Sequence, residues 1–155
     1  MMQLHLLDNP VDRVEGEVAV ALFFLDDRPP TGSAALLDWR LNGKLTEQLL
    51  QGKVSGCTGD HLLVRSNGKI AAGWALFVGG GRRRGLGMED CRELLRHLLA
   101  TCRLAGFSRI ALGLELLAGM NAVGLQKMVR AILDEMAPGN LDCLLNIVDD
   151  TVRLV

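Results

Sequence analysis

The fold is decided by residues 74–104, whose sequence is WALFVGGGRRRGLGMEDCRELLRHLLATCRL. The unbroken apolar run from Trp74 to Val78 predicts a strand that is buried on both faces of a sheet. Beyond a glycine- and arginine-rich segment, apolar residues recur at positions 91, 94, 95, 98, 99 and 102, which is the spacing of an amphipathic helix. Glu89 and Asp90 lie at the start of this helix, where its dipole favours negative charge, and Gly106 is placed to end it. The stretch is therefore predicted to form a β–α unit.

The rest of the second half continues this alternation. Residues 110–114 and 141–148 are predicted strands, and between them apolar residues at positions 125, 128, 129, 132 and 136 mark a second amphipathic helix. Asn121 is a suitable N-cap for that helix, and Pro138-Gly139 should stop it. Such alternation indicates βαβ units with right-handed crossovers.

The first half contributes further strands at residues 2–7 and 18–25. Asn67-Gly68 favours a tight hairpin between predicted strands at 62–65 and 69–72. Residues 33–50 have a helical pattern that is interrupted at Asn42-Gly43, so we expect two short helices in succession. Together these elements predict the α/β class: one three-layer α/β/α domain over residues 1–155, with a mixed, mostly parallel sheet.

The composition limits the kinds of partner. The chain has 155 residues, 49% hydrophobic and 23% charged, which fits one globular domain. Its net charge of −1 gives no overall field toward nucleic acid or membranes, and no apolar run approaches the roughly 20 residues of a membrane helix. The N-terminus lacks a signal-peptide pattern, so we expect a cytoplasmic location. Its four cysteines (Cys57, Cys91, Cys102 and Cys143) form no CxxC pair and no zinc-type spacing, so reduced thiols and no metal are expected.

The loop over residues 79–87 is the first candidate site. Its candidate residues are Gly79, Gly80, Gly81, Arg82, Arg83, Arg84, Gly85 and Gly87. A loop between a buried strand and a helix N-terminus can hold an anion, and arginines neutralise phosphate, so a nucleotide or another phosphorylated ligand is one hypothesis. However, a GxGxxG pattern from Gly79 would end on Arg84, and Leu86-Gly87 replaces the Lys and Ser/Thr of a Walker loop. Because acidic residues also occupy the first helical turn, we favour a solvated connecting loop.

Catalytic groups are sparse. The sequence has no HExxH or GxSxG motif, no cofactor is expected, and His97 should be solvated on the polar face of its helix. An enzyme with an unrecognised site would need His61, Asp60 or Asp149 to converge in a cleft. The three loop arginines are not interleaved with aromatic residues and the chain has no Tyr, so nucleic-acid binding is not expected.

A second segment, DRPPTGSAALLDWRLNG over residues 27–43, has the features of a packed helix. Its Pro-Pro pair and Gly32 set the entry to the helix. Asp38 and Arg40 are two positions apart and do not face each other on a helix, so each should pair elsewhere. A structural role is favoured for Asp38, Trp39 and Arg40, because a Trp beside charged residues is typical of a packing anchor.

This segment, continued through Lys44-Leu45, resembles the non-catalytic N-terminal domain of the leucyl (cytosol) aminopeptidase family. Gly56, Gly59-Asp60, the strand into Val78-Gly79 and the helix opening near Glu89 keep the family's order, and the resemblance spans roughly residues 18–148. It implies a macro-domain-like fold. In that family the two-metal peptidase site lies in a separate C-terminal domain, and its Asn-Thr-Asp-Ala-Glu-Gly-Arg signature is absent from this sequence, so no catalytic or metal residue carries over.

The resemblance implies a non-enzymatic accessory or interaction module, which is either a stand-alone relative or a piece of a larger enzyme. Its expected partner is another copy of itself or a peptidase catalytic subunit. Macro domains bind ADP-ribose through glycine-rich loops at strand ends. That keeps a small phosphate-ligand module, using residues 79–87, as the alternative.

Overall fold

A six-stranded sheet forms the centre of the protein, and the computed structural model describes residues 2–149. The strands lie side by side in the order β1-β6-β5-β2-β4-β3. Their bounds are β1 Met2–Leu6, β2 Val18–Phe23, β3 His61–Arg65, β4 Trp74–Gly79, β5 Arg109–Glu115 and β6 Leu141–Val148. Within this sheet β3 runs antiparallel to β4, and the other neighbours are parallel. The predicted mixed, mostly parallel sheet is confirmed.

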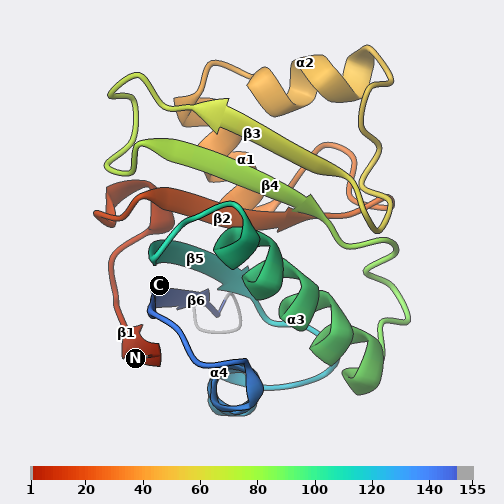
Figure 1. Cartoon of the computed structure of the whole chain (residues 1–155). Helices are drawn as coiled ribbons and strands as arrows, with labels where there is room; N and C mark the ends of the chain where they lie inside the picture. The colour runs from red at the N-terminus through yellow and green to blue at the C-terminus, as the bar shows by residue number, and fades with distance from the viewer. Residues whose placement is uncertain (1, 150–155) are drawn as a thin grey trace, which may run out of the picture.

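Helices cover both faces of the sheet (Figure 1). One face carries the short 3-10 helix η1 (Val11–Arg13), α1 (Gly32–Arg40) and α2 (Lys44–Leu50). The other face carries α3 (Met88–Leu104) and α4 (Ala122–Glu135). The structure thus has the expected α/β/α layers, and the helical region before residue 50 is broken at Asn42 and Gly43, which both have positive φ.

The central strand β2 shows why this arrangement is stable. Val18, Val20 and Leu22 face the core formed with α3 and α4, whereas the alternate residues Ala19, Ala21 and Phe23 face the core beneath α1. All six residues are buried. A strand with apolar residues on both faces requires a helical layer on each side, because side chains alternate across a sheet.

The helix N-cap predicted at Asn121 is present. Its side-chain Oδ1 accepts a hydrogen bond of 2.8 Å from the backbone N–H of Gly124. This contact satisfies one of the backbone donors that a helix leaves unpaired at its first turn. It sets the point at which the chain leaves β5 and enters α4.

The predicted strand at residues 69–72 is wrong. The hairpin partner of β3 is β4, and residues 66–73 form the connection between them. The backbone N–H of Ala71 donates to the Asp12 carbonyl, while Ile70 and Ala72 are buried in the core beneath α1. These contacts tie the segment to η1, so it does not pair with β3.

Candidate functional site

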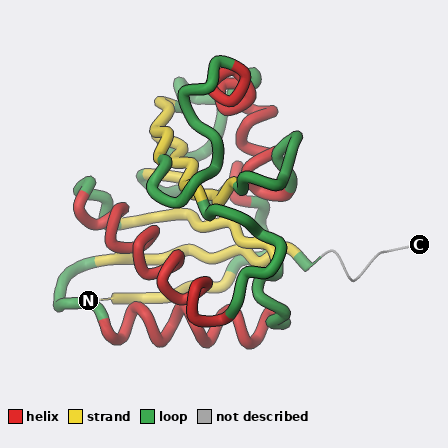
Figure 2. The backbone as a smooth tube through the Cα atoms, turned by 90° about the vertical axis from the view of Figure 1, so that its right-hand side faces the viewer, coloured by secondary structure: helices red, strands yellow, loops and turns green. Residues whose placement is uncertain are grey.

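The carboxyl ends of β2 and β5 form the natural place for a site. The two strands are neighbours, but the helix that follows β2 lies on one face of the sheet and the helix that follows β5 lies on the other. Open α/β sheets bind ligands at such a topological switch point. Figure 2 shows the parallel strands running from the side of the N-terminus toward the edge where the loops leaving their carboxyl ends gather. We call this edge the carboxyl edge.

At the switch point a side chain of the protein itself occupies the start of α1. The Glu115 carboxylate, at the end of β5, accepts hydrogen bonds from the Ser33 N–H (3.0 Å) and the Ser33 hydroxyl (2.7 Å) at the start of α1. Both residues are buried. Gly32 permits this approach, because a Cβ at that position would lie 2.3 Å from the Glu115 side chain. Glu115 therefore occupies the position that a phosphate or carboxylate ligand takes at a helix N-terminus.

The backbone of the predicted phosphate loop is also engaged. The N–H groups of Gly79, Gly80 and Gly81 donate to backbone carbonyls of neighbouring segments. Further along, the Asp26 carboxylate accepts the N–H groups of Arg84 (3.0 Å) and Arg83 (2.8 Å). These backbone hydrogen bonds lower the pKa of Asp26, because they stabilise its charged form. The loop thus directs these donors to a carboxylate of the same chain.

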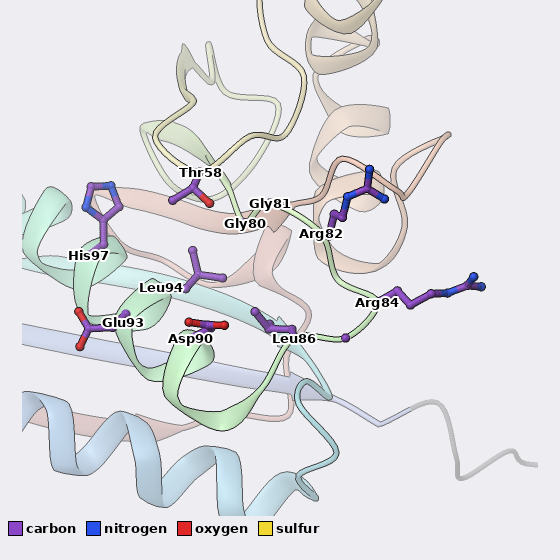
Figure 3. A pocket seen from close by; sticks show the side chains of 11 residues that line it. Thr58, Gly80, Gly81, Arg82, Arg84, Leu86, Asp90, Glu93, Leu94 and His97 are labelled. Atoms are coloured by element: carbon purple, nitrogen blue, oxygen red, sulfur yellow. The ribbon is translucent and has the colours of Figure 1, made fainter.

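The three loop arginines differ in their surroundings. The Arg83 guanidinium donates to Asp27 Oδ2 (3.3 Å) and to the Leu116 carbonyl (3.2 Å), and it lies over the ring of Phe24. It therefore joins the loops that follow β2, β4 and β5. Arg82 and Arg84 are exposed, and in Figure 3 their side chains extend away from the cleft beside the loop.

That cleft has a volume of about 550 Å³ and lies between the loop and α3. Its lining residues are Thr58, Gly80, Gly81, Arg82, Arg84, Gly85, Leu86, Asp90, Glu93, Leu94 and His97. Figure 3 shows Asp90, Glu93 and His97 on the α3 side, with Thr58 across from them. Of the predicted loop residues, Gly80, Gly81, Arg82, Arg84 and Gly85 line this cleft, whereas Gly79, Arg83 and Gly87 do not. Its α3 wall is acidic, which opposes the binding of an anion.

Two histidines meet near this cleft. The Nε2 atoms of His61 on β3 and His97 on α3 lie 3.0 Å apart. Burial lowers the pKa of His61, and the neighbouring His97 lowers it further. His97 is exposed, as expected, but its contact with His61, 36 positions away, could not be predicted from a local pattern.

The enzyme hypothesis based on His61, Asp60 and Asp149 is wrong in its geometry. Asp149 follows β6, and β6 and β3 are separated by β5, β2 and β4. Four steps between strands of about 4.8 Å each place these positions roughly 19 Å apart. The Asp60 carboxylate accepts the N–H groups of Ser55 and Gly56, and these hydrogen bonds lower its pKa. The Asp60 carboxylate therefore stabilises the turn before β3.

The segment around Trp39 connects three elements. The Asp38 carboxylate accepts the N–H groups of Leu45 (2.8 Å) and Thr46 (3.2 Å), so it caps the start of α2. Arg40 donates to buried Asp12 at 2.9 Å. Trp39 lies beneath the Arg40 guanidinium, but 70% of its surface remains exposed, so the prediction that it is a packing anchor is wrong.

Reactive groups are scarce among residues 2–149. Cys91, Cys102 and Cys143 are buried, and burial raises the pKa of both Cys102 and Cys143 to about 12, so their thiols stay protonated at neutral pH. In the same part of the chain, no group of three or more His, Cys, Asp or Glu residues is arranged to hold a metal ion. Nor does the described chain include a helix with the length and apolar character needed to cross a bilayer.

The layers, the strand order and the carboxyl edge define a macro-domain-like α/β/α protein. Residues 19–137 match the family described as the cytosol aminopeptidase family, N-terminal domain. The chain belongs to that family.

Individual relatives agree with this assignment. A protein of Sulfurihydrogenibium sp. (strain YO3AOP1), named a probable cytosol aminopeptidase, is 24% identical over 115 residues, which are 74% of this chain and 23% of that protein. A tomato leucine aminopeptidase variant has a TM-score of 0.70 at 16% identity, covering 96% of this chain and 32% of the other. A Trypanosoma brucei macrodomain in complex with ADP has a TM-score of 0.68 at 16% identity, covering 96% and 65%. The chain thus spans about a quarter to a third of the aminopeptidases that it matches.

Replacing Glu115 tests whether its carboxylate stabilises the fold. In Glu115→Ala the buried N–H and hydroxyl of Ser33 lose their acceptor, at a cost of about 1–3 kcal/mol each. We expect the melting temperature to fall by roughly 5–10 °C in thermal unfolding followed by circular dichroism. Asp134→Ala, at an exposed position of α4, is the control and should leave it nearly unchanged. Equal melting temperatures for both variants would contradict the role given to Glu115.

The loop arginines provide a second test. Arg83→Ala should destabilise the protein by about 1–2 kcal/mol in urea unfolding, because its guanidinium links Asp27 to the Leu116 carbonyl. Arg82→Ala and Arg84→Ala are matched controls from the same loop, and each should change stability by less than about 0.5 kcal/mol. A larger loss of stability in either control than in Arg83→Ala would contradict the stabilising role given to the Arg83 guanidinium.

Proposed function

We propose that this chain is a non-catalytic accessory domain that associates with a peptidase catalytic domain of the cytosol aminopeptidase family. The family match supports this, because it falls on the N-terminal domain over residues 19–137. The relatives carry several times this length, so in them the corresponding domain accompanies a much longer chain. The family also supports a cytoplasmic location.

The observation that carries the proposal is the occupation of the carboxyl edge by carboxylates of the chain itself. Glu115 holds the start of α1, and Asp26 holds the backbone of the loop at residues 83–84. The Glu115 carboxylate is buried and the Asp26 carboxylate is exposed, and each already accepts two hydrogen bonds that an incoming anion would have to replace. These donors therefore serve the domain's own structure, which favours a role through surface contacts over one through a bound anion.

The surface that suits such contacts lies over α1 and α2. Trp39 is 70% exposed and Leu50 is 84% exposed, and both line a shallow hollow of about 620 Å³ together with Pro30 and Ala35. Large apolar side chains gathered on an exposed surface indicate a site of protein contact, and Trp is a frequent anchor there. We call this the α1–α2 surface, and it can serve a peptidase catalytic domain or a second copy of the chain.

Association and hydrolysis can be measured on the purified chain. Sedimentation velocity with a cytosol aminopeptidase catalytic domain should show a complex that the double variant Trp39→Ala/Leu50→Ser weakens by at least about tenfold, as expected for loss of an aromatic anchor. Leu104→Ser is the matched control, because Leu104 is 90% exposed but lies at the end of α3. Metal-dependent hydrolysis of a leucyl anilide by the chain alone would overturn the proposal.

A second candidate function is the binding of a phosphorylated small ligand in the cleft beside residues 79–87. The cleft volume and the position of Arg82 and Arg84 at its rim favour it, as does the similarity in fold to a macrodomain that holds ADP. Isothermal titration calorimetry with ADP-ribose and ATP distinguishes the two functions. The accessory-domain proposal expects no heat of binding at high micromolar ligand, whereas saturable binding that Arg82→Ala and Arg84→Ala abolish would favour the ligand module.

A further inference from the structure

The contact between His61 and His97 is not explained by the accessory role. His61 opens the edge strand β3, and His97 lies on α3, 36 residues later. Their Nε2 atoms are 3.0 Å apart, their ring planes differ by 23° and their ring centroids are separated by 5.1 Å. Both residues are exposed, so an ion from solvent can reach the two nitrogens.

We infer that these two imidazoles form a binding site for a divalent transition-metal ion. Two nitrogens that share a tetrahedral zinc ion, each at about 2.0–2.1 Å, lie roughly 3.3 Å from one another. The observed separation of 3.0 Å is within a few tenths of an ångström of that value. Neutral imidazole suits Zn²⁺, Ni²⁺ and Cu²⁺, and carboxylate-preferring ions such as Mg²⁺ are not expected.

The surrounding charges favour a cation. The Asp60 carboxylate precedes His61 and acts on it electrostatically in the direction that stabilises positive charge. On α3, Asp90 and Glu93 line the same cleft as His97, and Glu93 is four positions before His97, on the same face of the helix. The neighbouring cation Arg96 is paired with Glu93 and Glu135, while Arg82 and Arg84 line the opposite side of the cleft from α3.

The site would be open. Two protein ligands are present, and among the described residues no third His, Cys, Asp or Glu completes a metal-binding group. Water or a carboxylate from a bound molecule would therefore occupy the remaining positions, which is the arrangement of an ion that can exchange ligands and not of a closed structural zinc site. A bound ion would also connect the edge strand β3 to α3.

Titration with NiCl₂ and ZnCl₂ at neutral pH tests the inference. Calorimetry should show one ion bound by the wild-type chain, and His61→Ala and His97→Ala should each weaken binding by at least about tenfold. His5→Ala is the matched control, because His5 is an exposed histidine on β1, at the opposite edge of the sheet. It should leave the affinity unchanged.

A second measurement locates the ion independently of the truncations. In histidine-selective nitrogen NMR, the Nε2 signals of His61 and His97 should shift together on addition of Zn²⁺, and that of His5 should not. His61→Gln and His97→Gln keep a polar side chain and so guard against local misfolding. In each of these variants the Nε2 signal of the remaining histidine of the pair should no longer shift. Absence of binding up to millimolar metal, or binding unaffected by both substitutions, would overturn the inference and leave only a hydrogen bond between two rings. Neither outcome changes what is expected of the association experiment with the catalytic domain.

Discussion

The hydrogen bonds between Glu115 and Ser33 are the contact on which the carboxyl edge of the sheet depends. They join the end of β5 to the start of α1, two elements that belong to opposite sides of the switch point. A buried carboxylate is tolerated only when donors surround it, and the backbone N–H at a helix N-terminus is among the strongest available. The glycine at position 32 completes the arrangement, because a side chain there would collide with Glu115.

Carboxylates of the chain also accept backbone hydrogen bonds in the loop after β4. Asp26 satisfies the backbone of residues 83 and 84, and Asp27 pairs with the Arg83 guanidinium, so the loop after β2 holds the loop after β4. Positions that attract an anion in this class of fold are thereby converted into internal cross-links. At this edge polar groups of the chain pair with one another, while apolar side chains such as Trp39 and Leu50 remain exposed.

Local patterns in the sequence were sufficient to predict the layers of the fold but not the contacts between those layers. Apolar runs identified the buried strands, and the three-four spacing identified α3 and α4, because both patterns depend on residues close together in the chain. The hairpin was misplaced because Asn67-Gly68 favours a turn, whereas the burial of Ile70 against the core beneath α1 determines where the following segment lies.

The groups at the candidate sites were harder to predict. Glu115 and Ser33 are 82 positions apart, and His61 and His97 are 36 apart, so only the strand order and the helix placement bring each pair together. An acidic residue that ends an otherwise apolar strand, as Glu115 does, is a local indication of a buried charge that needs donors. For the histidines the sequence offers no equivalent indication, since both lie at exposed positions.

The distribution of the four thiols has a practical consequence. Cys57 is exposed, whereas Cys91, Cys102 and Cys143 are buried and carry raised pKa values. A maleimide dye should therefore attach to the folded protein at one position without any engineering. The backbone carbonyl of Cys57 lies against Gly79, and the next residue, Thr58, lines the cleft, so such a dye would be attached one residue from the cleft lining.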